Sequence, residues 1–216
     1  MTRKSQSYTK AAAPLYDAQG RQALAIYDLS EDDSPWFRYH RYYWKKPNEP
    51  KCEVAPLVMG KIAPRGHPAY HYEVLLPDDA PGRYKAIEDL LGNYDRALPP
   101  HEKTAFAQFT IDHEPEESWI TTGELVRSWA LEQFVEPHGL AVVIVHHIPE
   151  LSGSGNDPHH HVIVFPRRLT SNGFGMHVLG VADDEGYLGA HVSWHASIEP
   201  GDVFEAIIDD IDTPAN

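Results

Sequence analysis

The chain contains an apolar run that predicts the centre of the fold: Leu140-Ala141-Val142-Val143-Ile144-Val145-His146-His147. It is rich in β-branched residues, which is typical of a strand buried on both faces of a sheet. A loop rich in Gly, Ser and Asn follows over residues 152–158 and leads into His159-His160-His161-Val162-Ile163-Val164-Phe165. This arrangement predicts that the second run returns beside the first as its antiparallel partner.

The segments around this hairpin predict further strands and helices. Residues 83–93 and the stretch from Thr121 to Gly139 have helical spacing, and the second has a capping-box pattern at Thr121 and Glu124. Short helices are also expected over 11–16 and 202–211, and a loop or extended wrap over 47–67. Strands are predicted over residues 22–29, 71–77, 104–112, 175–181 and 187–195.

This pattern of strands and helices predicts an α+β fold, with an antiparallel-rich central sheet and helices packed on it. We expect residues 1–216 to form a single domain, which fits the length of the chain. Within it, residues 1–65 are an irregular basic and aromatic N-terminal segment, and residues 200–216 are an acidic tail.

The charge is distributed unevenly along the chain. The sequence has 18 Lys+Arg against 32 Asp+Glu, for a net charge of −14. Residues 1–65 hold 11 basic and 7 acidic side chains, a balance of +4, whereas residues 66–216 hold 7 and 25, a balance of −18. An interaction with nucleic acid would therefore depend mainly on the N-terminal segment.

Several classes of protein are not supported by the sequence. No run approaches the roughly 18–20 apolar residues of a membrane span, so no membrane partner is expected. The first residues have no secretory pattern. Cys52 is the sole cysteine and cannot form a disulfide framework or a cysteine-rich zinc site. These features predict a cytoplasmic protein.

Histidines are concentrated where the two central strands meet. Residues two apart on a strand share a face, so His159 and His161 project together while His160 points away. The preceding strand ends in His146 and His147, and its register decides which of them joins the pair. Three imidazoles with open coordination positions would suit a catalytic metal. A pH-sensitive surface or hydrogen-bonded core histidines are the structural alternatives.

Beyond these histidines, the sequence resembles a known family. Three pieces of the sequence are similar to the Asn-Pro-His-x-His…Arg…Gly-Phe-Gly signature of MobA/MobL-type relaxases. They are Asn156-Asp157-Pro158-His159-His160-His161-Val162-Ile163-Val164, then Arg167-Arg168-Leu169, and finally Gly173-Phe174-Gly175. These are conjugative-plasmid nickases of the HUH endonuclease superfamily. The resemblance covers about residues 71–175. Three further matches occur in the same order, at residues 71–77, 122–139 and 142–146.

The sequence also departs from the family pattern. Asp157 interrupts the Asn-Pro pair, and the loop between His146 and His159 is longer than expected. The family's nucleophile helix has its nearest match at Ala11-Ala12-Ala13-Pro14-Leu15-Tyr16, where a proline interrupts the helix. This departure affects the assignment of the nucleophile most.

The resemblance implies a chemistry for the histidines. In the family, a tyrosine hydroxyl attacks a phosphodiester and forms a 5′-phosphotyrosine. By resemblance, His146, His159 and His161 would hold a divalent ion (Mn, Mg, Zn, Co or Ni) that polarises a phosphate oxygen. Glu73 would orient an imidazole from a neighbouring strand. The nucleophile is expected to be Tyr16, with three tyrosines as rivals: Tyr39, Tyr42 and Tyr43.

Single-stranded DNA at an origin-of-transfer-like site is the expected partner, with accessory mobilisation proteins as further partners. Aromatic and basic side chains alternate over residues 36–46, a pattern that suits base stacking and phosphate contacts. The alternative is a strand whose aromatic side chains cover the sheet. Beyond the central hairpin, Arg167 and Arg168 would hold phosphate oxygens or form salt bridges. Within residues 36–46, the predicted DNA contacts are Trp36, Arg38, Tyr39, Arg41, Tyr43 and Lys45.

Two other functions are compatible with the sequence. A catalytically degenerate relaxase-like domain that binds DNA or protein would explain the weak tyrosine helix and the acidic balance. A three-histidine metalloenzyme acting on a small molecule would need a closed apolar pocket over the imidazoles. A nickase would instead need an open groove for several nucleotides.

Overall fold

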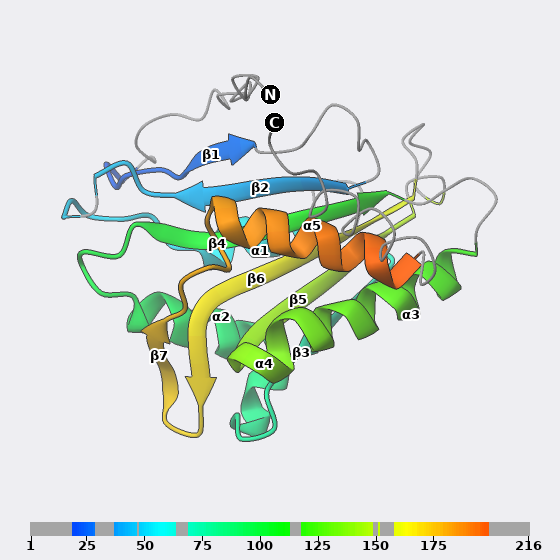
Figure 1. Cartoon of the computed structure of the whole chain (residues 1–216). Helices are drawn as coiled ribbons and strands as arrows, with labels where there is room; N and C mark the ends of the chain where they lie inside the picture. Colours follow the sequence, from blue (N-terminus) through cyan, green and yellow to red (C-terminus); the bar gives the residue numbers. More distant parts are fainter. Residues whose placement is uncertain are drawn as a thin grey trace, which may run out of the picture.

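The fold is built on an antiparallel sheet, shown in the computed structural model in Figure 1. The structure describes residues 19–28, 37–46, 48–63, 69–112, 118–148, 151 and 158–198. Within these residues the sheet has seven strands, in the order β1-β2-β4-β6-β5-β3, with β7 paired to β6. Their bounds are β1 Ala25–Asp28, β2 Phe37–Tyr43, β3 His71–Leu75, β4 Thr104–Asp112, β5 Leu140–His147, β6 His159–Thr170 and β7 Gly173–His177.

The predicted hairpin lies in the middle of this sheet. β5 and β6 are antiparallel neighbours, and β4 and β3 flank them on either side. All the strand pairs of the sheet are antiparallel over the described residues. The prediction of an antiparallel-rich α+β fold is therefore confirmed. The strands expected at 71–77 and 104–112 are also present, the second with the same bounds.

Helices cover both faces of the sheet, and each face has its own hydrophobic core. On one face lie α1 (Ala55–Ile62), the 3-10 helix η1 (Gly82–Lys85) and α2 (Ile87–Ala97), which pack on Ala141, Val143 and Val145 of β5. We call this the α1/α2 face. On the other, the α3/α5 face, the alternate β5 residues Val142 and Ile144 pack under the remaining helices. These are α3 (Trp119–Ala130), the π-helical turn η2 (Leu131–Val135), α4 (Glu136–His138) and α5 (Asp184–Ile198), drawn in front of the sheet in Figure 1.

One predicted strand, over residues 187–195, is wrong, because this segment belongs to helix α5. Its buried side chains Tyr187, Ala190 and Trp194 are spaced by three and four residues, so they lie on one helical face against the core. Near the start of α5, Gly186 lies so close to the backbone of Val181 that a Cβ atom would clash with its carbonyl. The packing of these side chains against the core thus overrides the apolar–polar alternation that predicted a strand.

The expectation of a loop over residues 47–67 is also wrong in part, because α1 lies within it. The start of this helix is stabilised from α2. The Asp95 carboxylate accepts hydrogen bonds from the backbone N–H groups of Val54 and Ala55, at 2.7 and 3.0 Å. A cap supplied from forty residues further along the chain leaves no local signal in the sequence.

Other predictions fare differently. The helix that follows Thr121 is present but begins earlier, at Trp119, and the side chain of its N-cap residue Ser118 makes no capping hydrogen bond. It continues to His138, and Gly139 ends it with a left-handed φ of 65°. The helices expected at 11–16 and 202–211 and the acidic tail lie outside the described residues. Among the described helices, none combines the length and apolarity that crossing a membrane would require.

Candidate metal centre

The register of β5 and β6 decides which histidines share a face. His147 is paired with His159, Val145 with His161, and His146 with His160. Directly opposed residues of an antiparallel pair project to the same face, and so do residues two apart on one strand. His147, His159 and His161 therefore lie together on the α1/α2 face. The expected ligand His146 is wrong for this group, because it points to the α3/α5 face.

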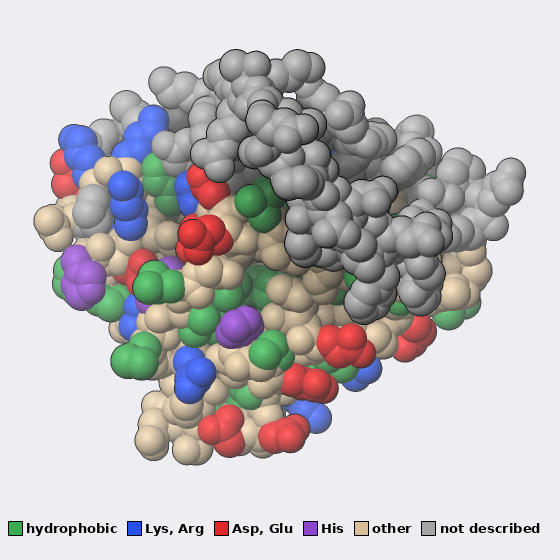
Figure 2. Space-filling view, viewed as in Figure 1, with side chains coloured by type: hydrophobic (Ala, Val, Ile, Leu, Met, Phe, Trp, Pro, Cys, Tyr) green, Lys and Arg blue, Asp and Glu red, His purple; other side chains and the backbone are tan. Residues whose placement is uncertain are grey.

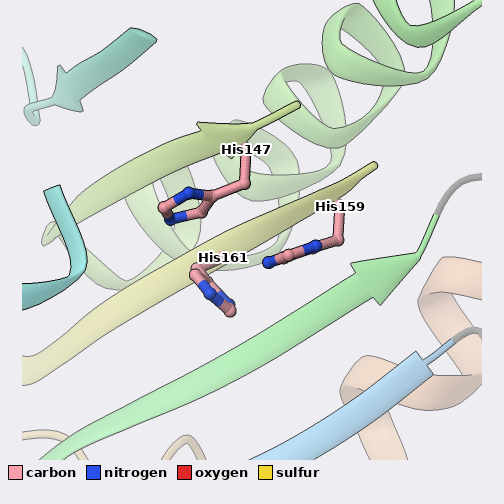
Figure 3. A group of neighbouring side chains, drawn as sticks. All are labelled: His147, His159 and His161. Carbon is pink, nitrogen blue, oxygen red and sulfur yellow. The ribbon is translucent and has the colours of Figure 1, made fainter. Parts of the chain in front are cut away.

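The three imidazoles converge closely enough to share one ion. Each offers a ring nitrogen, and these nitrogens all lie within 4.8 Å of one another. Figure 3 shows His147 reaching from β5 toward His159 and His161 of β6. The ring centroids are 5.1 Å apart for His147–His159, 5.2 Å for His147–His161 and 4.9 Å for His159–His161. All three side chains are half-buried, so the cluster reaches solvent. We call it the triad.

Neighbouring groups hold two of these rings in place. The Nδ1 atom of His161 lies 2.9 Å from the Thr110 hydroxyl and 3.3 Å from the Gln108 amide nitrogen, both on β4. The Gln108 amide also donates to the Thr110 hydroxyl at 3.1 Å. His147 forms a hydrogen bond with the backbone of Lys61 in α1. Such contacts leave the other nitrogen of each ring available to a metal.

The protonation of the triad also suits a cation. Burial first, and then repulsion from His159, lowers the pKa of His147 to about 4. The same two causes, with the charge of Lys61 next, lower the pKa of His161 well below its usual value. Both rings are therefore neutral at pH 7, which is the form that binds metal ions. The residues present fit a borderline transition ion held by nitrogen.

Basic side chains flank the triad on the same face. Lys61 comes from α1, and burial lowers the pKa of its ammonium group. Arg38 of β2 lies close enough to act on the charge of His161, and its guanidinium forms an ion pair with Asp112 at 2.6 Å. Sequence reasoning had selected Arg38 as a DNA contact, whereas Lys61 was missed. Lys61 therefore adds positive charge beside the triad, whereas the charge of Arg38 is offset by Asp112, which is paired with His159 in the sheet.

A second polar cluster lies on the α3/α5 face. The Nδ1 atoms of His146 and His160 are 2.8 Å apart, and the Nε2 atom of His146 is 3.8 Å from the Glu73 carboxylate. Glu73 also accepts a hydrogen bond from the Nε atom of Arg127 at 3.0 Å. Burial alone raises the pKa of Glu73, but His146 and Arg127 together lower it. Glu73 does approach an imidazole, although not one of the triad.

Some of the predicted DNA contacts have structural roles. Tyr39 is fully buried in the core of the α3/α5 face, and that burial raises the pKa of its phenol further above neutral. It is therefore not available for base stacking. Arg41 forms an ion pair with Asp184 of α5 at 3.3 Å. Tyr43 is half-buried and Lys45 is exposed. Tyr16, the candidate nucleophile, and Trp36, a candidate for base stacking, lie outside the described residues.

The arginines after the metal strand are far from the triad. Arg167 is six residues beyond His161 on β6, a distance of about 20 Å along a strand. It donates to the Glu102 carboxylate at 2.7 Å, and both side chains are about 10% exposed. Arg168 is exposed and donates to the carbonyl of His138. Of the two roles left open for these arginines, Arg167 has the salt bridge and not the phosphate contact beside the histidines, since β6 extends further than predicted.

Glu102 is the centre of a small ionic network at that end of the sheet. Its carboxylate accepts from Arg167 and from the backbone N–H of Lys103 at 2.9 Å, and it faces His177 at 3.5 Å. Burial opposes ionisation, but these contacts, with that of His177 the largest, lower the pKa of Glu102 to about 2. The network therefore serves structure rather than the triad.

The sequence held signals for some of the residues it missed. Gln108 and Thr110 are polar positions within the otherwise apolar run 105–111, and both are buried. Buried polar side chains need hydrogen-bond partners, so two of them spaced by two residues indicate a polar site on one face. Tyr72 of β3 is paired with Val145, which puts it on the triad's face of the sheet. Tyr42, by contrast, is buried against Phe106, and burial raises its pKa to about 12.

Comparison with known proteins supports the fold. No protein-family model matches the chain, and no curated protein matches it. A solved structure, described as the molecular basis of vancomycin resistance transfer in Staphylococcus aureus, is similar to it with a TM-score of 0.51 and 18% sequence identity. The similarity covers 61% of this chain and 69% of that chain. At this identity it shows the fold alone, and that structure shares the antiparallel-rich α+β architecture described above.

Proposed function

We propose that the chain is a metal-dependent relaxase-like domain that nicks and rejoins single-stranded DNA at an origin-of-transfer-like site. The observation that carries this proposal is the convergence of His147, His159 and His161 on one face of the sheet, beside two cations. The shared fold with the solved structure described as the molecular basis of vancomycin resistance transfer also supports it.

The residues around the triad would divide the work between them. His147, His159 and His161 would hold a divalent ion, which polarises a phosphate oxygen when it is bound. Thr110 and the Lys61 backbone keep two of the imidazoles oriented. The Lys61 ammonium group and the Arg38 guanidinium would attract the phosphates on either side of the scissile bond.

The nucleophile would be a tyrosine. Its phenol oxygen bonds to phosphorus, the bond to the 3′ oxygen breaks, and the phenolic proton ends on the released 3′-hydroxyl. Tyr39 and Tyr42 are buried, so neither is suited to this role. Tyr16 remains the first candidate from the sequence resemblance. Tyr72 is the second, because it lies on the α1/α2 face with the triad.

Covalent capture tests this function directly. The chain is incubated with Mn²⁺ and single-stranded oligonucleotides labelled at the 3′ end, and a denaturing gel detects a labelled protein adduct. We expect an adduct that EDTA abolishes and that His161→Ala reduces by about a hundredfold or more, about 2.7 kcal/mol. His101→Ala is the matched control, because His101 is exposed and belongs to no part of the triad.

The tyrosine variants separate the remaining possibilities. Loss of the adduct in Tyr16→Phe with retention in Tyr72→Phe assigns the nucleophile to Tyr16, and the reverse pattern assigns it to Tyr72. Full adduct formation by His161→Ala would contradict a role for the triad. If no oligonucleotide forms an adduct while DNA still binds, the nickase function is wrong and the degenerate binding domain is correct.

A small-molecule metalloenzyme is the other candidate, but the site favours it less. That function would need a closed apolar pocket over the imidazoles. The triad is instead half-buried, and the charged side chains around it include Lys61 and the ion pair of Arg38 with Asp112. Cations beside an accessible metal site are better suited to a polyanion.

A further inference from the structure

Helix α5 carries a second pair of histidines, on the face of the sheet opposite the triad. His191 and His195 are four residues apart, so their side chains lie one above the other on the helix surface. Their Nε2 atoms are 3.2 Å apart and their ring centroids 4.4 Å apart. Both side chains are half-buried. In the metal-free chain, one ring donates its N–H to the other.

The separation of these nitrogens matches a chelate. Two imidazole nitrogens bound at 2.0–2.1 Å, with a tetrahedral or right-angled geometry, are about 2.9 to 3.4 Å apart. The observed 3.2 Å falls within this interval. An ion can therefore replace the shared hydrogen at this separation of the nitrogens, with both rings turned so that their lone pairs point at the ion.

Packing against the core holds one ring in position. His191 meets Phe37 edge-on at a centroid distance of 5.4 Å and lies 5.8 Å from Tyr187. The next turn of the helix is fixed by the buried Trp194 and by a hydrogen bond from Trp129 to Ser193 at 3.2 Å. Ligands held by packed neighbours lose little freedom on binding a metal.

The site belongs to the same end of the sheet as the triad. Phe37, which contacts His191, is paired with Ile111, and Ile111 is paired with His160. Figure 1 shows α5 lying in front of the sheet, and Figure 2 shows Asp and Glu side chains spread over this face of the molecule. The sheet itself separates the two groups of histidines.

From this geometry we infer that His191 and His195 form a second metal site, which takes a borderline divalent ion such as Ni²⁺, Cu²⁺ or Zn²⁺. Imidazole ligands select these ions over Mg²⁺ or Ca²⁺. The motif is His191-Val192-Ser193-Trp194-His195 and has no glutamate after the first histidine, unlike the hydrolytic His-Glu-x-x-His helix. The inferred role of the ion is to tie two turns of α5 together, and the motif lacks the general base of that class of hydrolase.

Equilibrium dialysis with Ni²⁺ alone tests this inference. The wild-type chain is expected to bind one ion more than His195→Gln, and His101→Ala is expected to match the wild type. His195→Gln is preferred over a change at His191, because His191 packs against Phe37 and its loss could disturb the fold. Circular dichroism of each metal-free variant checks that the helix is intact.

Tryptophan fluorescence gives an independent measure. Trp194 precedes His195, and its ring centroid lies 5.5 Å from that of Trp129, so a paramagnetic ion on α5 quenches both. Quenching by Ni²⁺ should persist in His161→Ala and should fall in His195→Gln to the level produced by an ion at the triad alone. Equal Ni²⁺ stoichiometry in the wild type and His195→Gln, or quenching lost with His161→Ala, would overturn the inference. Neither outcome depends on DNA nicking, so the proposed function is tested separately.

Discussion

Replacing Thr110 with valine tests how the triad is oriented. The change keeps the shape of the side chain but removes the hydroxyl that lies 2.9 Å from the Nδ1 atom of His161. The Gln108 amide nitrogen, 3.3 Å from the same Nδ1 atom, is then the nearest polar partner. An amide N–H can only donate, so it favours the tautomer in which Nδ1 accepts and Nε2 carries the proton. That tautomer cannot bind a metal through Nε2.

The expected loss of affinity follows from these contacts. A neutral hydrogen bond contributes about 0.5–1.5 kcal/mol, and the tautomer mismatch adds to it. Loss of an orienting partner typically lowers metal affinity by about 10- to 100-fold, or about 1.4–2.7 kcal/mol. We therefore expect Thr110→Val to raise the dissociation constant of the triad for Zn²⁺ within that range. The metal-free chain should also lose about 1–3 kcal/mol of stability, because valine fills the same buried space but removes the hydroxyl that the Gln108 amide and the His161 ring contact.

The assay is competition for Zn²⁺ with a chromophoric chelator, carried out in the His195→Gln background so that an ion on α5 does not contribute. Thr122→Val is the matched control, since Thr122 is also buried but lies in α3 on the opposite face. The reasoning is refuted if Thr110→Val changes the affinity by less than about threefold, or if Thr122→Val weakens binding as much.

Other predictions concern stability and charge. Glu102→Gln should cost about 3 kcal/mol at pH 7 in urea unfolding, because it leaves a buried guanidinium unpaired. The pKa of Glu102 in the folded chain is lowered to about 2, so its contribution to the free energy of unfolding is present above about pH 4.5 and is lost toward pH 2. The stabilities of the variant and the wild type should therefore converge near pH 2. A difference between them that does not change with pH contradicts this. Gly186→Ala should lower stability by more than about 2 kcal/mol through a backbone clash, whereas Gly189→Ala, with open space around it, should add up to about 1 kcal/mol; thermal melts that rank them otherwise refute the packing. Lys61→Met should make the slope of log affinity for single-stranded DNA against log salt concentration shallower by about the value of one phosphate contact. Arg168→Ala, remote from the triad, should leave the salt slope unchanged, and the opposite result would relocate the DNA path.

The sequence predicted those parts of the fold that depend on local patterns. The apolar run of β5 and the alternation in β4 are visible within ten residues, and both strands have the predicted bounds. Helix α1 was not predictable in this way, because Asp95 of another helix supplies its cap. Helix α5 was mistaken for a strand, since its glycines, alanines and histidines imitate an alternating pattern until the packing of Trp194 is known.

The metal centre shows the same division between local and distant information. The alternation of side chains along one strand was enough to predict that His159 and His161 lie on the same face. The choice between His146 and His147 depended on pairing with another strand, which no local pattern specifies. Glu73 was recognised as a partner of an imidazole, but the face on which it acts followed from the same undetermined register.

The run of three successive histidines at the start of β6 has a consequence for how this chain can change. His159 and His161 serve one side of the sheet, and His160 contacts His146 on the other. A single residue inserted or deleted between His161 and Val164 would rotate all three rings to the opposite side. The imidazoles of His159 and His161 would then enter the layer beneath α3, and that of His160 would move to the side of Thr110. Mutational drift in this strand can exchange side chains, but it cannot alter the spacing without dismantling both clusters at once.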